Sequence, residues 1–279
     1  LLGSSSLLMQ RGLSESLGGR FEKTYLPHWS YSEIHNEFRL NLEEYFYFGA
    51  YPGAISLMAD ENRFRSYIND SLVESTISKD ILQMTEIRKP ALLKSLMELG
   101  VHYSGQIFSF QKMLGSLQEA GNVTTLSHYL DLLEDAGLLM GIEKFSGSHH
   151  KKKSSSPKFQ VLNTSIMTAQ SGLSFKEWKS DGAKWGRLVE SAVGAHIANQ
   201  AYGSRINIFY WRERGNEVDF VLEKDGKLVA LEIKSGLNKG VKSGMSAFSK
   251  EFKPDKIYLI GGQGIPLEEF FTMKIEKLF

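Results

Sequence analysis

The last third of the chain has a pattern of apolar and polar positions that predicts a helix, three strands, a second helix and a fourth strand. Apolar residues repeat with helical spacing in the two helical segments and alternate or form short runs in the others. In order, the segments are 184–202, 206–213, 217–224, 227–236, 241–252 and 256–262. Asp225-Gly226, between two of the strands, is a typical two-residue hairpin turn.

The segment before it has a different pattern, of short helices followed by a hairpin. Residues 109–121 and a longer segment beginning at Asn122 have helical spacing. The strand-like segments 138–145 and 157–163 follow, joined by a long polar stretch. Helix, turn, helix and a hairpin with a polar tip is the arrangement of a winged helix-turn-helix.

A winged helix of this kind would contact DNA through the start of its second helix and through the tip of its wing. The residues concerned are Thr124, Thr125 and His128 in the helix and Lys151, Lys152 and Lys153 at the tip. The lysines there can reach phosphates. The acidic pair Glu134 and Asp135 argues against insertion of the whole helix into a groove. A small helical packing module has the same pattern, so both interpretations stay open.

Composition adds exclusions. The 279 residues include no cysteine, which removes disulfides and thiolate metal sites, and no apolar run approaches the roughly 18 residues that span a bilayer. These features favour a cytoplasmic protein without membrane contact. The net charge of +1 restricts any contact with nucleic acid to a local, modest patch.

The predicted hairpin carries charged residues inside otherwise apolar strands. By the strand period of two, Glu232 and Lys234 share one face, about 7 Å apart. In the partner strand, Asp219 shares a face with Val221, opposite Val218. Because the turn is tight, we expect it to fold Asp219 towards Glu232.

These side chains have the chemistry of metal-assisted phosphodiester cleavage. Glu190, from the preceding helix, lies on an otherwise apolar turn and needs a partner, because an unpaired buried charge is costly. Asp219 and Glu232 would supply the oxygen ligands that Mg²⁺ or Mn²⁺ prefers. The metal would polarise the phosphate and acidify a bound water, which Lys234 would orient.

This set resembles the PD-(D/E)xK nuclease superfamily, whose core has the same order of elements and whose signature is an Asp followed by Glu-x-Lys. The matching residues are Asp219 and Glu232-Ile233-Lys234, and Glu190 matches the acid of the helix. The resemblance implies that Glu190, Asp219, Glu232 and Lys234 form a catalytic set. Val218 stands where that superfamily often has a proline.

Taken whole, the chain resembles the prokaryotic AAA-type ATPases that carry a C-terminal DUF4143 domain. The segments that carry this resemblance are "LLGSSSLLMQRGLSESLGGR", "YFGAYPGAI", the winged-helix segment, "KWGRLVESAVGAHI" and the hairpin. It implies an α/β protein of the α+β kind with four parts. These are 1–40, the end of an ATPase domain; 41–100, a helical connector; 101–162, the winged helix; and 163–279, a restriction-endonuclease-like domain.

The same resemblance implies nucleotide-sensing roles for Ser5 and Arg20. The chain has no G-x-x-x-x-G-K-[ST] sequence, so we expect ATP only in a longer protein of which this chain is a fragment. The expected partners are DNA, the missing ATPase domain and further copies of the same chain. Asn163 stands where the family usually shows Asp.

Three functions are compatible with these features. The first is a DNA-binding, Mg²⁺-dependent nuclease module. The second is a non-catalytic module that binds nucleic acid or protein on a degenerate nuclease fold, regulated by the ATPase part. The third is a purely structural role within an ATPase oligomer, which the near-neutral charge permits.

Overall fold

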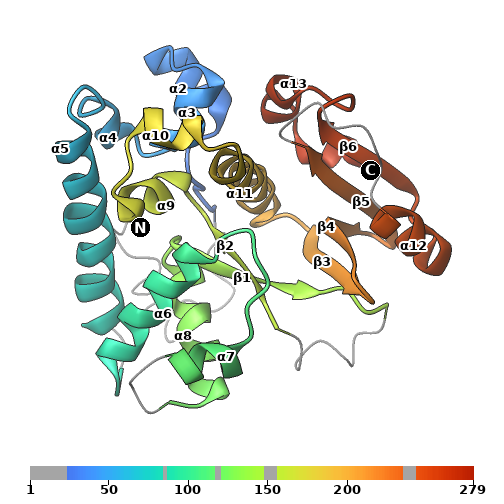
Figure 1. Cartoon of the computed structure of the whole chain (residues 1–279), viewed down its shortest axis with the longest axis horizontal. Helices are drawn as coiled ribbons and strands as arrows, with labels where there is room; N and C mark the ends of the chain where they lie inside the picture. The colour runs from blue at the N-terminus through green and yellow to red at the C-terminus, as the bar shows by residue number, and fades with distance from the viewer. Residues whose placement is uncertain (1–23, 84–86, 117–120, 148–155, 235–242) are drawn as a thin grey trace.

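The computed structural model of the chain describes residues 24–83, 87–116, 121–147, 156–234 and 243–279. They form a mixed α/β structure in which helices pack against one open sheet, as the sequence predicts (Figure 1). Five predicted site residues lie outside the described residues: Ser5, Arg20, Lys151, Lys152 and Lys153.

The regular elements of the described chain up to residue 135 are all helices, and they pack around one large core. The first, α2 (Tyr31–Phe38), begins with a capping box. The Ser30 N–H donates to the Glu33 carboxylate at 2.7 Å, and the Glu33 N–H donates to the Ser30 hydroxyl at 3.4 Å. The helices that follow are α3 (Leu42–Phe48), α4 (Pro52–Ile55), α5 (Glu61–Ser66), α6 (Pro90–His102), α7 (Phe110–Ser116) and α8 (Val123–Asp135).

A long helical rod begins with α5. It continues into two π-helical stretches, Tyr67–Glu74 and Thr76–Leu82, without a break in the helical backbone. The rod buries one apolar side in the large core, through Phe64, Ile68, Val73, Ile77 and Ile81. π-Helices usually occur as single turns, frequently at functional sites, so two successive stretches are unusual.

α6, α7 and α8 are followed by two antiparallel strands, in the order predicted for the winged helix. The strands are β1 (Leu139–Lys144) and β2 (Lys158–Val161). Their register places Leu139 opposite Val161 and Ile142 opposite Lys158. α8 packs against β1 and α6 against β2, so helices cover this hairpin.

The C-terminal part has the predicted order of helix, three strands, helix and strand. Its elements are α11 (Gly182–Ala201), β3 (Asn207–Glu213), β4 (Asn216–Lys224), β5 (Lys227–Lys234), α12 (Ser243–Phe252) and β6 (Lys256–Gly261). Two short helices, α9 (Thr164–Ser171) and α10 (Phe175–Ser180), connect it to β2. α13 (Leu267–Thr272) and a 3₁₀ turn (Ile275–Leu278) end the chain.

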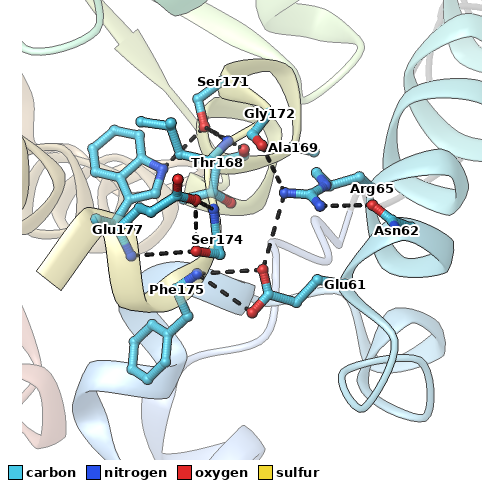
Figure 2. Close-up of polar contacts among 12 residues, drawn as sticks. Glu61, Asn62, Arg65, Thr168, Ala169, Ser171, Gly172, Ser174, Phe175 and Glu177 are labelled. Carbon is cyan, nitrogen blue, oxygen red and sulfur yellow. Dashed lines mark hydrogen bonds and ion pairs between the residues drawn. The ribbon is translucent and has the colours of Figure 1, made fainter.

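A polar network fastens the connection between α9 and α10 to α5 (Figure 2). Arg65 donates from Nη1 to the Gly172 carbonyl at 2.9 Å, and the Glu61 carboxylate accepts the Phe175 N–H at 3.3 Å. The Tyr47 hydroxyl donates to the same carboxylate at 3.0 Å. These bonds hold the rod against the segment that leads into α11.

The six strands form one sheet in the order β2-β1-β3-β4-β5-β6. β1 and β3 pair in parallel, with Glu143 opposite Phe209 and Lys144 opposite Tyr210. The β1–β2 hairpin therefore extends the C-terminal sheet, and one sheet spans the domain boundary that the sequence predicts after residue 162. Within the described ranges, no helix has both the length and the apolar composition needed to cross a bilayer.

Different helices cover the two faces of the C-terminal strands. α11 packs in the large core with Phe220 and Leu231, and α12 covers a second core that includes Trp211, Val221 and Phe248. α11 stands between the strands and the helices α6 and α9 (Figure 1). It is therefore placed to present side chains both to the sheet and to the helical part.

Candidate functional site

The hairpin of β4 and β5 folds as the sequence predicts. Both residues of the Asp225-Gly226 turn have positive φ, 49° and 80°, which a type I′ turn between antiparallel strands requires. The β4–β5 ladder ends at the pair Phe220–Leu231. Asp219 and Glu232 come directly after that pair, so the two predicted metal ligands lie at the same end of the hairpin.

A β-bulge in β4 changes the direction of Asp219. The register between β3 and β4 shifts at Tyr210, which lies opposite two residues of β4, Asp219 and Phe220. Strict alternation predicted that Val218 and Val221 face opposite ways, but both pack in the core under α12. That prediction was wrong, because a bulge adds one residue and reverses the alternation beyond it. Bulges often lie beside functional sites, where they redirect a side chain.

Asp219 and Glu232 are both buried, with exposed fractions of 5% and 1%. The Asp219 Oδ2 atom accepts the Ile233 backbone N–H at 2.8 Å, beyond the last pair of the ladder. The Lys234 ammonium lies 3.0 Å from Glu232 Oε1. Glu232 and Lys234 are thus neighbours on one face, as the strand period predicts, and they form an ion pair.

Lys158, which has no place in the sequence motif, enters the same site from β2. Its side chain is fully buried, and its ammonium lies 2.7 Å from Glu190 Oε1 and 3.3 Å from the Asp219 backbone carbonyl oxygen. It also stands 4.8 Å from the centre of the Phe220 ring, a cation–π distance. Lys158 is therefore the partner that the Glu190 carboxylate needs.

Burial and neighbouring charges act together on this pair. Burial by itself would lower the pKa of Lys158, but attraction to Glu190 and Asp219 outweighs it and raises that pKa. Burial raises the pKa of Glu190, and repulsion from Asp219 and Glu217 adds to the rise, against the attraction of Lys158. One lysine is shared by several acids, so it keeps its proton while each acid is only partly compensated.

A close approach of α11 to β2 fixes Glu190 in this position. Gly194 of α11 lies so near β2 that an added Cβ would come within 2.0 Å of Gln160 Oε1. Gln160 Nε2 donates to the Ser191 carbonyl at 2.7 Å, and the Ser191 and Ser104 hydroxyls share a hydrogen bond of 2.9 Å. This buried polar layer holds the helix that carries Glu190 over the strand that carries Lys158.

The acids of the site are already engaged by other groups of the protein. Carboxylate oxygens are suitable donors for Mg²⁺. However, Glu190 and Glu232 each pair with a lysine, and Asp219 binds a backbone N–H. Within the part of the chain that the structure describes, no three His, Asp or Glu side chains lie close enough together to hold a metal ion. A divalent cation at Asp219 and Glu232 would therefore compete with Lys234 and with the Ile233 N–H for these carboxylate oxygens.

A second candidate surface lies at the start of α8, the predicted DNA-contacting helix. It is a concavity of about 660 Å³. Its lining includes Arg88, Lys89, Thr124, Thr125 and His128. The Lys89 N–H donates to the Tyr129 hydroxyl at 3.2 Å, which ties the segment before α6 to α8. The structure thus adds two cations to the three predicted helix residues.

The acidic end of α8 is occupied by contacts within the protein. Burial, with repulsion from Asp131 and Asp135, raises the pKa of Glu134 to about 7. Burial raises the pKa of both Tyr25 and Tyr202, and repulsion from Asp135 and Glu134 adds to the rise. The two tyrosine rings stack with their centres 3.5 Å apart. Glu134 and Asp135 thus lie at the opposite end of α8 from Thr124, Thr125 and His128.

Two family models match the chain. Residues 39–177 match "Domain of unknown function (DUF8612)", and residues 185–273 match "Domain of unknown function (DUF4143)". The matches are separated at the junction of α10 and α11. No solved structure matches the chain.

Curated relatives come from bacteria and an archaeon. Uncharacterized proteins of Mycobacterium bovis and Mycobacterium tuberculosis are each 26% identical over 241 residues, covering 84% of this chain and 51% of theirs. An uncharacterized protein of Methanocaldococcus jannaschii is 24% identical over 246 residues, covering 81% of this chain and 53% of its own. The chain spans about half the length of these relatives. Its residues 185–273, which carry the hairpin, the bulge and the buried acids, match the DUF4143 model, in agreement with the C-terminal part of the resemblance found in the sequence.

Proposed function

We propose that this chain is a DNA-binding module. It docks duplex DNA at the start of α8 and uses its nuclease-like DUF4143 domain as a non-catalytic scaffold. The observation that carries the proposal is the concave surface where Arg88 and Lys89 flank the first turns of α8. The acids of the nuclease-type site support the second half of the proposal, because Glu190 and Glu232 each form an ion pair with a lysine of the chain.

The docking surface has the donors that a phosphate backbone requires. Arg88 and Lys89 supply positive charge, and the hydroxyl of Thr124 and the ring of His128 supply hydrogen-bond donors. The Thr125 hydroxyl donates to Asn122 Oδ1 at 3.0 Å, so it can only accept. The N-terminal end of the 13-residue helix adds a partial positive charge. Such contacts fix the position of a duplex without reading its sequence. We therefore expect salt-dependent binding with modest sequence preference.

We further propose that this docking serves a larger protein. The curated relatives are about twice as long as the region that matches this chain. The additional length is enough for the ATPase domain that the sequence resemblance implies. ATP would bind that domain, while the present chain would hold DNA and assemble with the ATPase domain or with further copies.

DNA docking is tested by removing the two cations of the surface together. Fluorescence anisotropy would measure binding of a labelled duplex to wild type and to the double variant Arg88→Gln/Lys89→Gln at several salt concentrations. Each lost phosphate contact reduces the slope of log affinity against log salt by about 0.9, so we expect a reduction of about 1.8. Wild type that does not bind duplex DNA at low salt would refute the proposal.

The matched control is the double variant Lys227→Gln/Lys256→Gln, which removes two exposed charges from the neighbouring strands β5 and β6. We expect its affinity and salt slope to equal those of wild type. Equal weakening by both double variants would show that binding depends on overall charge and not on the surface at α8.

Metal-dependent cleavage is a second candidate function. It is favoured by one observation: Asp219, Glu232 and Lys234 all lie at the end of the β4–β5 ladder. Cleavage would require Lys234 to leave Glu232. This candidate expects wild type to cut DNA in the presence of Mn²⁺, and Lys234→Ala and Asp219→Ala to abolish cutting. If wild type and Lys234→Ala leave duplex, single-stranded and branched DNA equally intact, cleavage of those substrates is excluded.

A further inference from the structure

A cleft of about 560 Å³ lies among the π-helical rod, α6, α9 and the start of α11. This volume is within the range of pockets that bind small molecules. Its apolar lining comes from segments far apart in the sequence, through Val73, Ile77, Met97, Met167 and Trp178. The cleft is separate from both the buried acids and the docking surface at α8.

The walls of the cleft are held in place by polar contacts. Ser171 lines the cleft, and its hydroxyl accepts the Trp178 indole N–H at 2.9 Å. The neighbouring bonds from Arg65 and Glu61 fasten this segment to α5, at the beginning of the rod (Figure 2). The rod lines the opposite side of the cleft with two π-helical stretches, a conformation that is frequent at functional sites.

The charged group of interest in this cleft is Arg187 of α11. Its Nε atom is buried and has no hydrogen-bond partner among the described residues. Burial lowers the pKa of its guanidinium, which nevertheless stays charged. Because the protein encloses this Nε atom, a ligand in the cleft would meet the Nη groups of the same guanidinium.

The acids around the cleft do not supply that partner. The Glu74 carboxylate accepts a hydrogen bond from the Lys94 ammonium at 2.5 Å, and both side chains line the cleft. Asp70 and Glu98 are exposed at the rim, and within the described ranges neither lies within ion-pair distance of Arg187. These rim acids would repel a polyanion such as DNA. They leave room for a small ligand with a single anionic group.

We infer that this cleft is a binding site for a small organic anion, in which Arg187 holds a carboxylate or phosphate group and Trp178 and Met97 contact an apolar body. A guanidinium presents paired N–H donors in a fixed plane, which matches the two oxygens of either group. The apolar lining accounts for the rest of the ligand. The inference is independent of DNA binding, since no residue of the α8 surface takes part.

Probe binding tests the inference directly. Thermal unfolding of wild type would be followed with benzoate, phenyl phosphate and inorganic phosphate. We expect benzoate or phenyl phosphate to raise the Tm in a saturable manner, and inorganic phosphate, which has no apolar body, to have no such effect. The probe with the larger shift distinguishes a carboxylate site from a phosphate site. No shift with either organic probe, or an equal shift with inorganic phosphate, would overturn the inference.

Two variants of Arg187 separate binding from structure. Arg187→Gln keeps a polar amide near the position of Nε, so its Tm without probe should be close to that of wild type, and it should lose the probe-induced shift. Arg187→Lys keeps the charge without the planar donors and should bind at least about tenfold more weakly. The control Arg205→Gln removes an exposed arginine elsewhere and should keep the full shift. A full shift in both Arg187 variants would refute the role of Arg187.

Discussion

The nuclease-type site and the Arg187 cleft differ in how their charges are compensated. In the first, Lys158 and Lys234 form ion pairs with Glu190 and Glu232. In the second, the Arg187 Nε atom is buried without a hydrogen-bond partner among the described residues. The first site is the one that a sequence motif identifies, whereas the second belongs to no motif. The residues of a catalytic sequence motif can therefore be engaged within the protein, while a charged residue outside any motif lacks a partner for one of its donors.

The buried pair also joins the parts of the chain that match the two family models. Lys158 belongs to β2 and Glu190 to α11, on the two sides of the junction between the family matches. The parallel pairing of β1 and β3 joins the same two parts through the sheet. Charge compensation at this site is therefore structural, and the comparison predicts that breaking it harms folding more than any change to the exposed cations.

The largest effect is expected from Lys158→Met, which leaves Glu190 without its partner. Removal of one member of a buried ion pair is strongly destabilising, so the free energy of unfolding should fall by about 3 kcal/mol. Urea unfolding followed by circular dichroism would measure it. Lys227→Met, at an exposed position of β5, should change the free energy by less than about 0.5 kcal/mol.

The double variant Lys158→Met/Glu190→Leu sharpens this prediction. Replacement of both members by apolar side chains removes the uncompensated charge, so most of the lost stability should return. A double variant less stable than Lys158→Met alone would contradict the assignment of Lys158 and Glu190 as partners.

A second, smaller effect concerns His196. This buried histidine stays neutral, and its ring lies within hydrogen-bond distance of Gln200 Nε2. Burial lowers its pKa from 6.5 to about 4. The unfolded chain therefore binds a proton below pH 6.5 that the folded chain does not bind until about pH 4. This contribution to stability is present above pH 6.5 and is lost as the pH falls, by about 2 kcal/mol at pH 5.

The measurement is the free energy of unfolding at pH 7 and at pH 5 in wild type and in His196→Phe. We expect the variant to lose that part of the pH dependence, whatever its absolute stability. His102→Gln changes an exposed histidine and should keep the wild-type slope. An unchanged slope in His196→Phe would mean that another group titrates in this range.

The smallest effect is expected at Asn163. Its Oδ1 atom accepts three hydrogen bonds, from the Ala50 N–H, the Ser165 N–H and the Ser165 hydroxyl. Its Nδ2 atom is buried without a partner among the described residues. A carboxylate suits three donors at a helix start, so Asn163→Asp should add up to about 1 kcal/mol at pH 7. A loss of stability in urea unfolding would show that burial of the charge outweighs these bonds.

The sequence predicted the local features of this protein better than its charge pairing. Alternation and the Asp225-Gly226 turn identified the hairpin, and the pairing of Glu232 with Lys234 follows from the strand period. The direction of Asp219 depends on a bulge, which arises from the register of β4 against β3. Local periodicity carries no information about that register.

Long-range partners were also beyond prediction. Lys158 lies 32 positions before Glu190, and only the packing of α11 on β2 brings them together. The parallel pairing of β1 with β3 crosses the predicted domain boundary. The sequence identifies Arg187 as an arginine in a helix, but its lack of a partner is a property of the packed structure.

The central claim is that DNA docks at α8 while Glu190 and Glu232 of the nuclease-type site stay in ion pairs with lysines and do not catalyse cleavage. An electrophoretic assay of labelled duplex DNA with wild type, in the presence of Mn²⁺ and before and after removal of the protein, tests both halves at once. The account predicts retarded DNA that is recovered intact, and weaker retardation by Arg88→Gln/Lys89→Gln at the same protein concentration. DNA that is cut by wild type and left whole by Asp219→Ala would contradict it.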